Sequence, residues 1–258
     1  MKTRLIALFG GVALAGSLLF VSAGIATAAG PAAGGLPGAG PAGKDVCATQ
    51  AAAVKAGATV DTLRAFGDCE INRRFTTLTA LGSRVTGSRV LTTSDAAALQ
   101  GEIASTTSGL TSLKATIDAE TNMAALKAEI VKIATDYRVY LLVVRQVNLV
   151  SGADGVAAAQ ARFAPINTTL SARIAAAKAA GKHTTAAQTD LDAMNASVAA
   201  AAGLAGPLPA TLLALTPAQY DAGSAGPVMD NARTALVQAR DDLKSAIASA
   251  KACRDALK

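Results

Sequence analysis

The feature that most limits how this chain can fold is a run of large apolar side chains at residues 130–150. The rest of the sequence is rich in alanine, threonine and serine, whose side chains bury little apolar surface. Around this run, apolar residues recur at steps of three and four, as they do on one face of an amphipathic helix: Met123, Leu126, Ile130, Ile133, Tyr137, Tyr140, Val144 and Val147. We therefore expect a central helix at about residues 121–144, with the other segments packed against it.

The end of this run has two interpretations. β-Branched residues are dense at residues 143–150, and they suit a buried strand as well as a helix. Because no other segment offers a strand to pair with, we expect the frayed end of the central helix and a buried turn. The next helix is expected at residues 151–180, with capping-box spacing between its first residue and Asp154. Pro165 removes a backbone donor inside it, so this helix should either kink or split near Phe163.

Similar patterns predict further helices elsewhere in the chain. Capping-type starts, glycine stops and apolar residues at alternating steps of three and four place them at residues 59–89, 92–119, 185–203 and 228–257, with a short one after residue 45. Long three-four alternation favours packing of the coiled-coil type. The expected fold class is all-α: an elongated antiparallel helical bundle with coiled-coil-like heptad seams and about six main helices.

The N-terminal residues predict export rather than structure. Lys2 and Arg4 precede an apolar run at residues 5–25, and Ala26-Thr27-Ala28 is a small-x-small cleavage site. We interpret residues 1–28 as a signal peptide; a retained anchor is the weaker alternative, because glycines interrupt the run. Residues 29–43 contain almost only glycine, alanine and proline and predict a disordered tether. Residues 44–258 are expected to form a single helical-bundle domain.

The charge of the chain is mild. Signal cleavage removes two cations and no acidic residue, so the formal net charge falls from +6 to +4. The cations are spread out and not interleaved with aromatic residues, so nucleic-acid binding is not expected. An unidentified protein or an anionic envelope polymer is the expected partner. We expect no stable membrane insertion after cleavage, and self-association through the heptad seams stays open.

An exported chain can form disulfides, and the three cysteines allow one bridge. If the short first helix folds back at Gly57, Cys47 comes opposite residues around 68, within reach of Cys69. If instead six helices alternate up and down, Cys69 approaches Cys253. We favour Cys47 with Cys69, because that pairing needs one local turn and not a correct count of five connections.

Three stretches also carry a resemblance: LRAFGDCEINRRFTTLTAL at residues 63–81, LKAEIVKIATDYRVY at residues 126–140, and AAAKAAGK with LDAMNA at residues 175–196. With these stretches, the chain resembles a group of uncharacterised exported proteins of high-GC Gram-positive bacteria, which are α-helical and coiled-coil-like. The resemblance covers most of the mature chain and implies a secreted helical protein without an assigned activity. It carries over no catalytic residues.

Residues that usually carry chemistry are scarce. His183 is the single histidine and lies in an expected turn, and the chain has no Gly-rich phosphate loop, CxxC pair or nucleophile elbow. We therefore expect no enzyme, no cofactor and no metal site. The leading hypothesis is a non-catalytic structural or interaction protein of the bacterial exterior, secreted or associated with the cell wall. The alternative is a carrier for a small apolar ligand, with a pocket formed by Tyr137, Tyr140 and Phe163 beside the Pro165 kink.

Overall fold

The computed structural model describes residues 46–258, and this part of the chain is helical with no strand. The predicted signal peptide and tether lie outside the described residues. The elements are α1 (Ala48–Ala56), α2 (Val60–Thr86), α3 (Thr93–Ala119), α4 (Met123–Thr135), the π-helix η2 (Val139–Val143), α5 (Val144–Gln160), α6 (Phe163–Ala179), α7 (Thr185–Ala205), α8 (Leu208–Leu213), α9 (Pro217–Asp221) and α10 (Ala225–Asp255).

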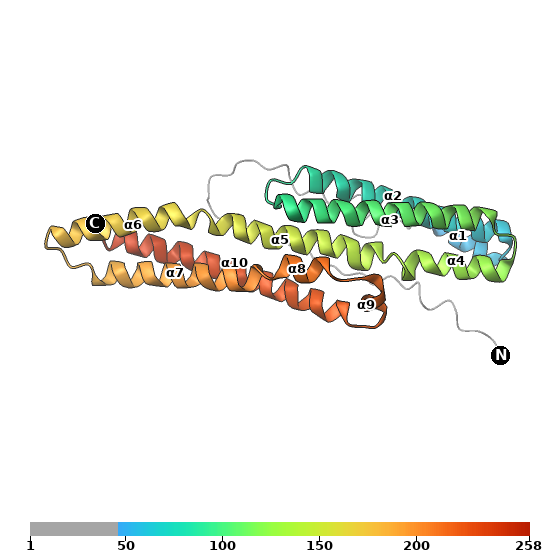
Figure 1. The fold of residues 1–258 in the computed structure, drawn as a ribbon. Coiled ribbons are helices and arrows are strands. Elements are labelled where there is room, and N and C mark those ends of the chain that lie inside the picture. Colours follow the sequence, from blue (N-terminus) through green and yellow to red (C-terminus); the bar gives the residue numbers. More distant parts are fainter. Residues whose placement is uncertain (1–45) are drawn as a thin grey trace.

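The helices form a long, thin bundle (Figure 1), which confirms the all-α fold class. The α4, α5 and α6 helices follow one another in one direction and extend along the whole bundle. The antiparallel pair of α2 and α3 packs against α4 and part of α5, while α7 and α10 form a second antiparallel pair against α5 and α6. The α5 helix therefore lies between two helix pairs, and α4, α5 and α6 do not alternate up and down.

Capping residues explain where several helices begin. The Thr59 side chain accepts a hydrogen bond from the Thr62 amide, and the Thr62 hydroxyl accepts one from the Thr59 amide. The Thr92 side chain caps α3 by accepting from the Asp95 amide at 3.0 Å. At the start of α4, the cap is Asn122, where the sequence had suggested a helix from about residue 121. Each cap satisfies donors that the first helical turn leaves free.

The central helix is interrupted where a continuous helix was expected. The α4 helix ends at Thr135, and Arg138 adopts a left-handed backbone conformation, with φ of 41°. Beyond the break, residues 143–150 are helical, so the predicted buried turn and the helix start at Ser151 are wrong. The reason is the position of α5 between two helix pairs: a helix covered from several sides can bury apolar residues around most of its circumference.

Pro165 was expected to kink or split a helix, and the structure shows a split. The α5 helix ends at Gln160 and α6 begins at Phe163, which places Pro165 in the first turn of α6. Amide groups of a first helical turn have no partner within the helix, so proline is tolerated there.

Two apolar cores follow each other along the bundle. The first includes Leu78, Leu110 and Ile133 from α2, α3 and α4, and the second includes Met194 and Leu243 from α7 and α10. Two partly buried leucines, Leu149 of α5 and Leu208 of α8, pack against both cores. The two cores are thus in contact through α5 and α8.

One stretch of the described residues, Thr185–Leu213, is long and apolar enough to cross a membrane by length and composition alone. Its larger side chains Leu191 and Met194 are buried in the second core, and none of the large apolar side chains exposed among the described residues lies in this stretch. The exposed apolar surface of α7 is mostly alanine, which gives the stretch its high mean hydropathy.

The first prediction concerns α4. Replacing Ile133, which is 2% exposed, with alanine should lower the free energy of unfolding by about 2–5 kcal/mol, because it opens a cavity in the first core. The matched control is Val131→Ala on the same helix, where the side chain is 48% exposed and the change should stay within about 0.5 kcal/mol. Urea unfolding followed by circular dichroism measures both; similar losses would contradict the placement of α4.

Candidate functional site

The most unusual backbone among the described residues lies at residues 136–143, which we call the α4–α5 junction. Arg138 is the one non-glycine residue there or elsewhere in the described chain with positive φ, and the next five residues form a π-helix. Both features are sparsely populated and persist only where surrounding contacts fix them. The side chains around the junction must therefore hold it in place.

Contacts from α9 hold Arg138. Its guanidinium group forms an ion pair with Asp221 and lies 5.3 Å from the ring centre of Tyr220. An arginine over an aromatic face gains electrostatic attraction in addition to the ion pair. The short α9 helix thus fixes the strained turn of the junction.

Tyr137 packs toward α3, against Gly109. A Cβ atom added at Gly109 would lie 2.5 Å from Cε1 of the Tyr137 ring, closer than real Cβ contacts allow. Burial, followed by the charge of Asp136, raises the pKa of the Tyr137 hydroxyl. The ring therefore fills the space that the missing side chain leaves.

Tyr140 lies against α2 instead. The guanidinium carbons of Arg73 and Arg74 lie 5.2 and 5.3 Å from its ring centre. Both arginines donate to Glu70 Oε2, at 2.8 Å from Arg73 and 2.6 Å from Arg74. The Thr77 Oγ1 atom lies 3.4 Å from the Tyr140 hydroxyl.

This cluster of Glu70, Arg73, Arg74 and Tyr140 contains a buried ion pair. Glu70 is 8% exposed and Arg74 is 7% exposed, so both charges have lost most of their water. Paired charges and the aromatic face replace that hydration, and removal of one partner would leave an uncompensated charge. The arrangement orients α2 on the junction, and its charged groups face one another.

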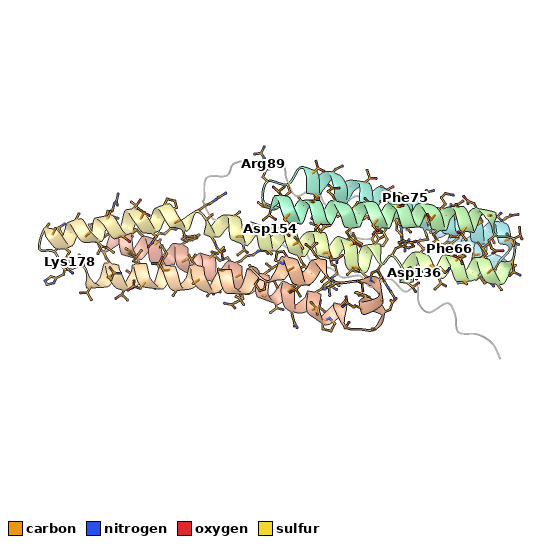
Figure 2. All side chains as sticks on the ribbon, viewed as in Figure 1. Phe66, Phe75, Arg89, Asp136, Asp154 and Lys178 are labelled. Atoms are coloured by element: carbon orange, nitrogen blue, oxygen red, sulfur yellow. A yellow bond between two sulfur atoms is a disulfide. The ribbon has the colours of Figure 1, made fainter. Side chains whose placement is uncertain are left out.

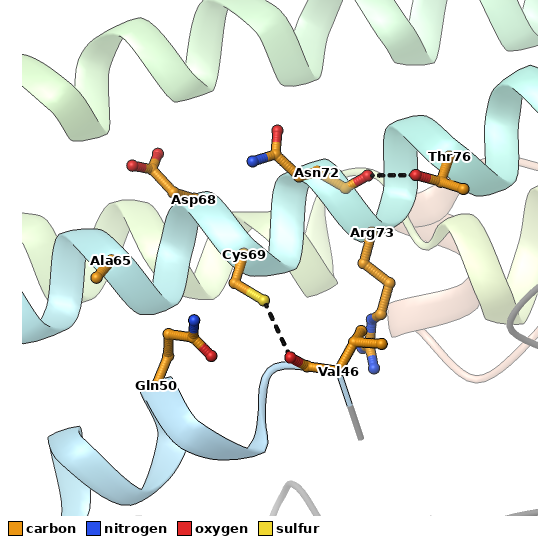
Figure 3. Close-up of a pocket in the computed structure, with 8 residues that line it drawn as sticks. All are labelled: Val46, Gln50, Ala65, Asp68, Cys69, Asn72, Arg73 and Thr76. Atoms are coloured by element: carbon orange, nitrogen blue, oxygen red, sulfur yellow. Dashed lines mark hydrogen bonds between the residues drawn. The ribbon is translucent and has the colours of Figure 1, made fainter. Parts of the chain in front are cut away.

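The Arg73 side chain also lines an open groove between α1 and α2. Figure 3 shows its walls, which are formed by Val46, Gln50, Ala65, Asp68, Cys69, Asn72, Arg73 and Thr76. Its volume is about 590 Å³, and most of its lining side chains are polar. A second hollow lies at the end of α3, lined by Ala115, Thr116, Ala119 and Glu120.

The structure does not gather the three residues suggested for a ligand pocket. Tyr137 contacts α3, Tyr140 contacts α2, and Phe163 belongs to the second core. None of the three lines either hollow. The continuous step pattern had suggested a shared face for the tyrosines, but the break at Arg138 separates them.

The predicted disulfide between Cys47 and Cys69 is confirmed, with Cα atoms 5.8 Å apart. The alternative bridge to Cys253 is wrong: that thiol is free and buried near the end of α10, far along the bundle from α1 (Figure 1). Burial, followed by the charge of Asp190, raises the pKa of Cys253, which keeps the thiol protonated. A structural disulfide indicates an oxidising compartment outside the cytoplasm.

His183 is exposed in the turn before α7, as the sequence suggested. Within residues 46–258, no group of three or more His, Cys, Asp or Glu side chains is arranged to hold a metal ion. Glu70 lies three and four residues before the two arginines, a spacing that predicts pairing along one helix, but nothing in the sequence indicates that Tyr140 lies beneath them. That contact joins segments 63 or more residues apart.

Comparisons with protein-family models, with curated proteins and with solved structures find no match to this chain.

The contact between Tyr137 and Gly109 yields a second prediction. Gly109→Ala should lower the free energy of unfolding by about 1–3 kcal/mol, because the ring must leave its place in the first core. Gly101→Ala on the same helix is the matched control: an added Cβ meets nothing within 4 Å there. In that position alanine should raise the stability by about 0.5–1 kcal/mol through its helix propensity. Equal gains at both positions, measured by thermal and urea unfolding, would contradict this packing.

Proposed function

We propose that this chain is a non-catalytic structural or interaction protein of the bacterial cell exterior, either secreted or associated with the cell wall. The observation that carries the proposal is the use of the charged and aromatic side chains at the α4–α5 junction. Arg138 binds Asp221 of α9, and the Tyr140 ring lies beneath Arg73 and Arg74 of α2, so these groups fix helices against one another. Such a site stabilises a long, thin bundle through contacts among its own side chains, which supports a structural role.

The hollows favour this role over a ligand carrier. Ligand pockets are concave and mostly apolar, with few polar groups. The groove at Arg73 is open, and its lining includes Gln50, Asp68, Asn72 and Thr76. No specific observation therefore supports an apolar ligand beside the tyrosines.

The proposed location combines two independent features. The disulfide between Cys47 and Cys69 is of the kind that forms and persists in an oxidising compartment. The sequence of residues 1–28 matches the pattern of a secretory signal, with a cleavage site after Ala28. Export across the cytoplasmic membrane accounts for both.

The proposed partner is an anionic polymer or a protein of the envelope. After cleavage the chain has a net charge of +4, with its cations distributed over the helices. Attraction of this kind is weak and long-ranged, and salt screens it. The apolar faces of the helices pack against one another inside the bundle. On α7 and α10, for example, Leu191, Met194 and Leu236 are buried in the second core. Binding through exposed charges is therefore the more favourable route.

Expression of the full chain with its own leader in a Gram-positive host tests this proposal. We expect the mature protein to begin at Ala29, to lie outside the cytoplasm, and to pass from the envelope fraction into solution as the salt concentration rises. Ala28→Leu should block cleavage, because the site requires a small residue, whereas Ala33→Leu should leave it unchanged. N-terminal sequencing and cell fractionation provide the measurements. A reduced, uncleaved chain in the cytoplasm, or one that resists salt and leaves the membrane only with detergent, would contradict the proposal.

A further inference from the structure

The positive charge of the chain is concentrated at one end of the bundle. We call this part, residues 161–205 and 233–258, the α6–α10 end, because it contains α6, α7 and most of α10. It carries ten lysines and arginines and five acidic residues, a formal net charge of +5. The other described residues, 46–160 and 206–232, carry eleven cations and twelve acids, a formal net charge of −1. The positive excess of the described chain therefore lies entirely at this end.

The cations of α10 and of the residues after it lie on one side of the helix. They follow one another at steps of seven, four or three, which bring residues to the same side of a helix with 3.6 residues per turn. We call these residues the basic row: Arg233, Arg240, Lys244, Lys251, Arg254 and Lys258. Val237 and Ile247 occupy the remaining positions of the same side. From Arg233 to Arg254 the row extends about 32 Å along the helix.

The basic row is open to solvent. Five of its side chains are exposed, and the sixth, Arg240, is half-buried beside Gly152 of α5. Arg233 and Lys251 form no ion pair with another described residue. Their charges are therefore available to a partner without the loss of an internal contact.

Two acids pair with cations of the row. Asp241 pairs with Lys244, and Asp255 pairs with both Arg254 and Lys258. The two carboxylate side chains are 54% and 49% exposed. Ion pairs in water are weak and salt screens them, so a polyvalent anion can replace these acids as the partner of the cations.

The other three acids of this end are engaged elsewhere. Asp242 on α10 and Asp192 on α7 each accept a hydrogen bond from a glutamine four residues earlier on their own helix. Asp190 acts through its charge on the buried Cys253. Among the described contacts, none of the three pairs with a cation of the row, so the row keeps its excess charge.

The α6 helix, which packs against α7 and α10, adds cations and no acid. Arg162, Arg173, Lys178 and, in the following turn, Lys182 are exposed. None of them has an ion-pair partner within residues 46–258. Figure 2 shows Lys178 at the tip of the bundle, where α6 leads into the turn before α7. Because residues 155–189 contain no Asp or Glu, no acid of this segment opposes these charges.

The side chains between the cations indicate which kind of anion fits. Helices that lie on a membrane insert a row of large apolar side chains, such as Trp, Phe and Leu. At the α6–α10 end the exposed large apolar side chains are Ile166 and Val237, one on each helix. The one aromatic residue of this end, Phe163, is buried, so no ring is available to stack on a nucleobase. A partner that is recognised by its charges alone therefore fits best.

We propose that the α6–α10 end is a docking surface for a linear polymer with a negatively charged phosphate group in each repeat, which lies along the basic row. The inference rests on the proposed function and names the polymer class and the surface that binds it. A straight row of cations contacts several phosphates of one chain, and each contact releases counterions. After the first contact, the next phosphates of the same chain bind at a high effective concentration, whereas single phosphate ions gain nothing of this kind.

Titration calorimetry of the disulfide-intact mature protein with long-chain inorganic polyphosphate tests the surface. We expect binding whose constant falls linearly with salt concentration on logarithmic axes. Orthophosphate at the same total phosphate concentration should not compete. Equal competition by orthophosphate would overturn the linear polymer. Binding to vesicles of anionic phospholipid as tight as to polyphosphate, at equal phosphate concentration, would indicate a membrane surface and would also overturn it.

The result is independent of where the protein resides in the cell. A purified protein that does not bind polyphosphate excludes the docking surface, but it leaves an exported structural protein. A chain that binds polyphosphate but stays in the cytoplasm contradicts the proposed location and leaves the surface in place.

Two double variants locate the binding surface. Arg233→Gln with Lys251→Gln removes two charges from the basic row, and Lys55→Gln with Lys127→Gln removes two exposed charges from the opposite end of the bundle. Glutamine favours helix, so both variants should keep the fold, which circular dichroism checks. The row variant should reduce the slope of the salt dependence by about two, one for each cation, and the control should leave it nearly unchanged. An unchanged slope in the row variant, or an equal reduction in both, would exclude the row as the binding surface.

Discussion

The structure depends on the packing of α5 between two helix pairs. Alanine-rich helices bury little apolar surface per residue, so large side chains must supply most of the stability. Those of α5 and the preceding η2 include Val143, Val147 and Val150 at the helix positions that face the first core, and each is almost fully buried. The same helix continues into the second core through Ala153 and Val156. Because α5 belongs to both, neither helix pair has a complete core without it.

Buried polar contacts then determine how the surrounding elements sit on this helix. Gln146 donates to the backbone oxygens of Leu212 and Leu215 and so fixes α8. Asp154 binds the Thr92 amide and fixes the tip of α2 and α3. Apolar side chains of similar shape can slide past one another, whereas a buried donor without an acceptor costs free energy. These contacts therefore select one arrangement among many that would bury the same surface.

Local signals in the sequence were sufficient for the fold class and for the disulfide. The bridge between Cys47 and Cys69 needs only one turn of the chain, between α1 and α2. The caps at Thr59 and Thr92 likewise bind the amides of nearby residues. The disulfide and the caps therefore follow from short spacings in the sequence. The break at Arg138 was not predictable in this way, because the step pattern of apolar residues continues across it.

The partners that fix the break at Arg138 and the tip of the α2–α3 pair are distant in sequence. Arg138 is held by Asp221, 83 residues later, and Asp154 resembles a capping residue but binds an amide 62 residues earlier. The contact of Tyr140 with the two arginines is equally non-local. Spacing rules describe neighbours along the chain, and they carry no information about such pairs.

Hydrogen exchange at increasing urea concentration tests most directly whether α5 joins both halves into one unit. In the wild type, the slowest amides of α3 and of α7 should open with the same free energy. Leu149→Ala, which removes a side chain packed against both cores, should lower the two values equally, whereas Leu141→Ala, at a 39% exposed position, should leave them nearly unchanged. Different opening free energies for α3 and α7, or a loss confined to one of them, would contradict the shared role of α5.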